Sequence, residues 1–206
     1  EERYSDLDAP EHDYWNRPLS DTFTGLIPKL ESGQMGLDSS SEKAFLLSLL
    51  EALKIPPSSQ MLVYSTTSLQ LSRISPRNPR AVYFSEDIYI GYVPRGQIEV
   101  VSIDPEAGGV YYIFDIPRNG NRIEVSRSTR CMNCHQRRIT GEVPGLIIKS
   151  VAPAPTGGTL ATFRKQDIGH AVRLDERFGG WHVTGEHGIE NHWGNAMGRL
   201  LSLIHI

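Results

Sequence analysis

The chain has 206 residues, of which 39% are hydrophobic, and it carries a formal net charge of −3 at pH 7. This length suits one domain or a domain with an arm, and the apolar fraction is sufficient for a real core. The small negative charge predicts neither nucleic-acid binding nor attraction to an anionic membrane, and no apolar run approaches the ~20 residues that span a bilayer.

Residues 1–37 are polar, weakly patterned and proline-bearing, which predicts an arm on the domain surface. A helix is predicted over about 40–54, because Ser39 and Glu42 have the spacing of a capping box and leucines recur at the helical period. These leucines are Leu46, Leu49, Leu50 and Leu53. Pro56-Pro57 then ends the helix.

Short β-branched or aromatic segments, bounded by turn residues, follow the helix. They are 61–65, 81–84, 88–93, 98–103 and 110–114, with a later apolar strand at 146–151 and a strand around His182. No segment between the first five is long enough for a parallel crossover helix, so we expect antiparallel strands. The predicted fold class is α+β, an antiparallel sheet with the N-terminal helix packed on one face.

We expect three parts along the chain: an arm at 1–37, a functional domain at 38–198 and a doubtful tail at 199–206. The tail is suspect because Leu200 to Ile206 is apolar and stops without a terminating signal. We assign no chemistry to His205 within it.

The most informative motif contains the only two cysteines of the chain, in Cys131-Met132-Asn133-Cys134-His135. C-x-x-C-H is the attachment signature of c-type haem. Two thiols one helical turn apart can each add to a haem vinyl group, and the following imidazole is the proximal ligand of the iron. The sequence therefore predicts covalent haem c on Cys131 and Cys134, with His135 bound to iron.

Two other interpretations use the same cysteines. A thioredoxin-like redox pair opens a helix directly after a buried strand, whereas the segment 125–130 before Cys131 is polar. A Cys2His2 zinc site needs two more ligands, which His187 with either His182 or His192 would supply. The gap between Cys134 and His187 is several times that of a zinc finger, so zinc is the lesser alternative.

Two resemblances support a cytochrome. The β-rich segment 109–115 leading towards a late C-x-x-C-H is loosely similar to the cytochrome P-460 and cytochrome c′-β group. Catalytic members of that group cross-link a lysine to haem, and no lysine here matches it. The chain more closely resembles uncharacterised monohaem c-type cytochromes of environmental bacteria, including planctomycetes. Three blocks carry this resemblance: 72–84, the C-x-x-C-H-Q segment, and 179–188 with 192–195.

The sixth ligand of the iron decides whether such a protein transfers electrons or binds small molecules. His187 is the leading candidate, because glycine flanks its loop and Glu186 could support a ligand. His170, His192 and an open site are the alternatives.

Three arginines, Arg73, Arg77 and Arg80, are spaced among Ser-Pro and Asn-Pro turns. Their guanidinium groups could hold haem propionates or an anionic substrate, or they could simply line a solvated loop.

The function expected from the sequence is a periplasmic or secreted monohaem c-type cytochrome, an electron carrier or redox module with a redox partner protein. In bacteria haem c is attached outside the cytoplasm, so this location follows from the motif and not from a signal segment, which Glu1-Glu2-Arg3-Tyr4 does not show. The alternatives are a haem enzyme, acting on peroxide or small nitrogen species, and a gas-sensing haem domain.

Overall fold

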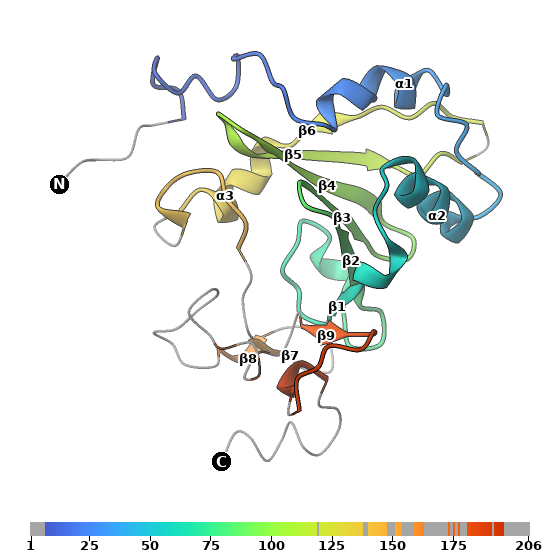
Figure 1. Cartoon of the computed structure of the whole chain (residues 1–206), viewed down its shortest axis with the longest axis vertical. Coiled ribbons are helices and arrows are strands. Elements are labelled where there is room, and N and C mark those ends of the chain that lie inside the picture. Colours follow the sequence, from blue (N-terminus) through green and yellow to red (C-terminus); the bar gives the residue numbers. More distant parts are fainter. Residues whose placement is uncertain are drawn as a thin grey trace. The chain divides into compact units, whose positions relative to one another are not determined.

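The structure, a computed structural model, describes residues 7–118, 120–137, 140–147, 151–153, 159–162, 173, 175, 177, 181–190 and 192–195. In chain order its strands are β1 (Met61–Val63), β2 (Arg80–Phe84), β3 (Ile88–Tyr92), β4 (Gln97–Asp104), β5 (Gly108–Asp115), β6 (Ser126–Arg127), β7 (Val151–Pro153), β8 (Thr159–Thr162) and β9 (His182–Val183). Seven of them form one sheet in the order β6-β5-β4-β3-β2-β1-β9, and β7 pairs with β8 (Figure 1). The α+β class and the antiparallel sheet predicted from the sequence are confirmed.

The helices are short. The α-helices are α1 (Ile27–Glu31), α2 (Glu42–Ala52) and α3 (Met132–His135), and the 3-10 helices are η1 (Thr24–Leu26), η2 (Pro57–Ser59), η3 (Leu71–Arg73), η4 (Thr129–Cys131) and η7 (Trp193–Asn195). The predicted helix is α2, but its cap is Ser41 and not Ser39. The Ser41 hydroxyl accepts a 3.1 Å hydrogen bond from the Ala44 N–H. The backbone at Ser41 is extended, with φ −156°, and the helix begins at the next residue, Glu42.

The five strands predicted between 61 and 115 are all present, with ends shifted by at most two residues. The pairs β1–β2, β1–β9, β4–β5 and β5–β6 are antiparallel. Of the strand predicted at 146–151, Leu146 and Ile147 are not in a strand, Val151 begins β7, and residues 148–150 lie outside the described part. β7 is a strand because it pairs antiparallel with β8. The apolar residues from which the strand was predicted do not indicate this pairing.

Contacts divide the chain into two compact units, which are described separately. The first comprises 1–55, 84–90 and 97–147, and the second 56–83, 91–96 and 148–206. This division does not test the domain boundaries predicted at 37 and 198, which stay a prediction.

Aromatic residues of the N-terminal segment belong to the core of the first unit. Tyr14 and Phe23 are fully buried, so the prediction of a surface arm is wrong for these side chains. The Tyr14 hydroxyl donates a 2.7 Å hydrogen bond to the Gly109 carbonyl. The Phe23 ring stacks on Phe114 at a centroid distance of 6.3 Å. Isolated aromatics carry no periodic signal, and only their contacts with β5 reveal them as core residues.

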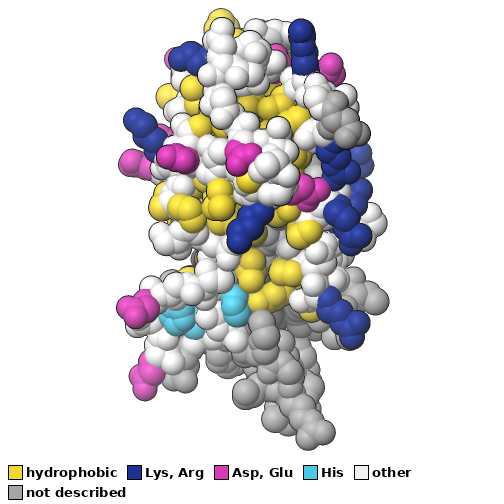
Figure 2. Space-filling model, turned by 90° about the vertical axis from the view of Figure 1, so that its right-hand side faces the viewer, with side chains coloured by type: hydrophobic (Ala, Val, Ile, Leu, Met, Phe, Trp, Pro, Cys, Tyr) yellow, Lys and Arg dark blue, Asp and Glu magenta, His cyan; other side chains and the backbone are white. Residues whose placement is uncertain are grey.

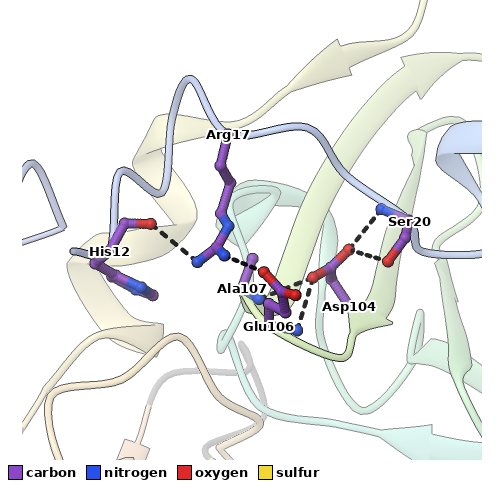
Figure 3. Close-up of polar contacts among 6 residues, drawn as sticks. All are labelled: His12, Arg17, Ser20, Asp104, Glu106 and Ala107. Carbon is purple, nitrogen blue, oxygen red and sulfur yellow. Dashed lines mark hydrogen bonds and ion pairs between the residues drawn. The ribbon is translucent and has the colours of Figure 1, made fainter. Parts of the chain in front are cut away.

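Asp104, the last residue of β4, ties this N-terminal segment to the sheet (Figure 3). Its carboxylate accepts hydrogen bonds from the N–H groups of Ser20, Glu106 and Ala107, at 2.7 to 2.9 Å. Burial opposes ionisation of Asp104, but these hydrogen bonds outweigh it and lower its pKa to about 2. Beside it, Arg17 pairs with Glu106.

In the second unit, β1 is the middle strand of the β2-β1-β9 portion of the sheet. Leu62 pairs with Ala81 on one side and with His182 on the other. The predicted strand around His182 is confirmed as β9.

Candidate haem attachment site

The C-x-x-C-H motif lies on a helical segment that begins at the edge of the sheet. β6 pairs with β5, and the Ser128 N–H donates to the Tyr111 carbonyl at 2.8 Å. The backbone then turns into η4 and α3, and Cys131 and Met132 both have right-handed helical dihedrals. Residues three apart on such a backbone share one side. Cys131 and Cys134 therefore project from the same side of one turn.

Neither cysteine is in a disulfide; Cys131 is half-buried and Cys134 is exposed. Burial raises the pKa of the Cys131 thiol, and its hydrogen bond with Ser128 opposes this rise. A redox-active thioredoxin-like cysteine has a lowered pKa. In addition, β6 is a polar strand paired antiparallel to β5, whereas the thioredoxin motif follows a buried strand of a parallel unit. Both observations disfavour the thioredoxin interpretation.

The imidazole of His135 is oriented by a backbone carbonyl. Its Nδ1 lies 2.8 Å from the oxygen of Gly145. A carbonyl oxygen only accepts, so Nδ1 carries the proton, and Nε2 is the nitrogen with a lone pair in the neutral ring. Metal-binding histidines are commonly oriented in this way by a backbone carbonyl.

The loop that carries Gly145 is fixed at several points. The Tyr111 hydroxyl donates to the same Gly145 oxygen at 2.6 Å, and the Gly145 N–H donates to the His135 carbonyl at 3.0 Å. The Gly109 N–H donates to the Pro144 carbonyl at 2.9 Å. At Gly108, where φ is +76°, a Cβ would lie only 2.7 Å from that carbonyl oxygen. Glycine therefore allows the β4–β5 turn to approach the loop.

The residues present fit covalent haem c. Both thiols lie on one side of a helical turn, the following histidine has the required tautomer, and the Tyr111 ring lies 4.5 Å from the His135 ring. Met132, between the cysteines, is buried and anchors the turn to the unit. Within the motif, Met132 is thus buried, whereas Cys131 is half-buried and Cys134 exposed.

The three arginines belong to the second unit, whereas the C-x-x-C-H motif belongs to the first. Arg73 ends η3 and is exposed, and Arg77 is exposed in a turn closed by Ser75 and Asn78. Arg80 is half-buried at the start of β2. The proposed role of the three in holding propionates stays a prediction.

The histidines predicted as sixth ligands also belong to the second unit, and His170 lies outside the described residues. His187 is half-buried, and its Nδ1 accepts a 3.1 Å hydrogen bond from the Ile189 N–H. This bond assigns the proton of a neutral ring to Nε2. Nε2 of His187 must lose this proton before it can bind a metal ion.

Tyr111 and Gly145 are the residues of the site that the sequence does not single out. Tyr111 is one of several strand tyrosines, and only its hydroxyl contact with Gly145 distinguishes it. The Pro144-Gly145 dipeptide ten residues after the histidine is the one available signal, because it predicts a turn.

The chain matches no family model, no curated protein and no solved structure. Among the described residues, no group of three or more His, Cys, Asp or Glu side chains is placed so that it could hold a metal ion. Within the same part of the chain, none of the helices is long and apolar enough to cross a membrane.

Proposed function

We propose that this chain is a monohaem c-type cytochrome that works as an electron carrier or redox module. One observation carries the proposal: the imidazole of His135, directly after two thiols on one helical turn, is held by the Gly145 carbonyl in the tautomer that binds iron. Cys131 and Cys134 form the thioether bonds in this proposal. The bound group supplies an iron that alternates between the ferrous and ferric states.

The roles of the chain's own residues follow from their contacts. The Gly145 carbonyl fixes the proton on Nδ1 of His135 and thereby leaves Nε2 as the nitrogen that would bind the iron. Tyr111 positions this carbonyl. Haem attachment outside the bacterial cytoplasm implies a periplasmic or secreted protein, and an electron carrier requires a redox partner protein.

The test is covalent attachment. The full chain is produced with haem-c maturation machinery and extracted with acidified organic solvent, which removes haem that is not covalently bound. We expect the wild-type protein to keep its haem and the Cys131→Ala/Cys134→Ala variant to lose any that it holds. A wild-type protein that loses its haem to the solvent would overturn the proposal, and stoichiometric zinc that is lost in the Cys131→Ala/Cys134→Ala variant would favour the Cys2His2 site.

A further inference from the structure

Buried polar atoms without hydrogen-bond partners are concentrated in one region of the second unit. Of the six such side-chain atoms among the described residues, four belong to Tyr64, Trp181, His182 and His192. An unpaired buried polar group is costly, so native proteins pair it with water, an ion or a ligand. Trp181, His182 and His192 lie in the block 179–195, which the haem motif does not explain.

His192 presents a buried lone pair. Its side chain is only 9% exposed, and its Nε2 lies 2.5 Å from the Trp181 carbonyl oxygen. Because the carbonyl only accepts, Nε2 carries the proton, and Nδ1 of the neutral ring has a lone pair with no partner. Such a hydrogen bond from one ring nitrogen to a backbone carbonyl is the usual support of a metal-binding histidine.

The segment that carries His192 is built against β9. The Asn195 side chain accepts from the Val183 N–H at 2.8 Å and donates to the Val183 carbonyl at 2.9 Å, as a neighbouring strand would. A Cβ on Gly194 would lie 2.8 Å from the Trp181 carbonyl carbon, so glycine is required there. These contacts fix the His192 ring next to Trp181, the residue before His182.

His182 supplies a second unpaired imidazole nitrogen, because its Nδ1 is also buried without a partner. His182 directly follows Trp181, whose carbonyl accepts from the His192 ring, so the two histidines are neighbours in this part of the fold. Tyr64 is two residues from Leu62, the residue paired with His182, and therefore shares its face of the sheet. The Tyr64 and His182 rings meet edge to face at 5.6 Å.

We propose that His182 and His192 bind one divalent transition-metal ion through their Nδ1 atoms. Imidazole nitrogen suits zinc, copper and nickel, and Zn²⁺ serves as the test ion. Since the described residues offer no group of three protein ligands, water or a small anion completes the coordination. The Tyr64 hydroxyl, buried and unpartnered, would donate a hydrogen bond to that ligand. Figure 2 shows histidine side chains on the face that it draws, with acidic side chains near them.

The experiment is calorimetric titration of the full, tag-free chain with Zn²⁺, carried out with and without haem. We expect one Zn²⁺ per chain, and a loss of affinity of about 100-fold or more for His182→Ala and for His192→Ala. His192→Gln separates binding from folding, because the glutamine amide keeps an N–H for the Trp181 carbonyl but lacks Nδ1. It should bind as weakly as His192→Ala while melting near the wild-type temperature.

The matched control is His12→Ala, because His12 is in the first unit, and it should bind Zn²⁺ like the wild type. His187→Ala tests a rival ligand, because the His187 ring meets the His192 ring at 5.0 Å while its own Nδ1 accepts from the Ile189 N–H. The proposal is overturned if the wild type binds no Zn²⁺, as expected of a site that holds only water, or if His187→Ala removes binding while His182→Ala does not. A haem spectrum that changes in His192→Gln without added zinc would assign this imidazole to the haem iron, which also overturns the proposal.

Discussion

Tyr111 and His135 hydrogen-bond the same acceptor, the carbonyl oxygen of Gly145. A carbonyl has two lone pairs, so it can accept from a phenol and an imidazole at once. The contact joins the middle of β5 to the residue that we propose as the proximal ligand of the iron. The sheet therefore determines the orientation of a side chain on a short helix outside it.

Replacement of Tyr111 by phenylalanine should leave haem attachment intact and change the properties of the iron. Loss of one buried hydrogen bond costs about 1 kcal/mol of stability. The Gly145 oxygen would then accept from His135 alone, and the imidazole would donate more strongly to ferric iron. We expect the reduction potential to fall, as measured by redox titration.

Tyr89→Phe is the matched control, because Tyr89 lies on β3 and its ring stacks on Phe84. It should leave the potential unchanged. If Tyr111→Phe lowers stability without moving the potential, then Tyr111 supports the fold only and does not position His135.

Asp104→Asn should destabilise the protein in a pH-dependent way. The pKa of Asp104 is lowered to about 2 from its ordinary 3.8, so the ionised form is favoured by folding. This contribution, about 2 kcal/mol, is complete above pH ~4 and is lost as the pH falls through the folded-state pKa. Denaturant unfolding should show the full difference between wild type and variant at pH 7 and a much smaller one at pH 2. A difference that does not vary with pH would contradict the assignment.

The sequence predicts the elements well where their side chains repeat with a regular period, as in β4, whose residues alternate between half-buried and buried. Prediction from the sequence fails where a contact between distant residues decides whether a side chain is buried or which tautomer it adopts. Tyr14 and Phe23 are buried through contacts with Gly109 and Phe114 of β5, which are far away in the sequence. The tautomer of His135 depends on a loop that returns ten residues later at Gly145, and no local pattern encodes that return.

The N-cap of α2 is Ser41 and not the Ser39 expected from the sequence, and this difference can be tested directly. Ser41→Ala removes the acceptor of the Ala44 N–H and should lower the free energy of unfolding by about 1 kcal/mol. Ser39→Ala, the substitution that the capping-box pattern would single out, should change it by much less. Thermal or denaturant unfolding of the two variants side by side makes the comparison. An equal or larger effect at Ser39 would restore the cap expected from the sequence.

The spin state of the haem iron tests the prediction that His187 is the sixth ligand. If it is, the wild-type spectrum is low spin, and His187→Ala should convert it to high spin and open the iron to carbon monoxide. His182→Ala should change neither property. For this to hold, His187 must exchange its hydrogen bond from the Ile189 N–H for a bond to iron, which costs about 1 kcal/mol and is small beside a metal–ligand bond. A wild-type protein that is already high spin and binds carbon monoxide freely would show an open iron. The haem enzyme or gas-sensing function would then replace electron transfer as the better proposal, with His187 or His170 as an acid-base group.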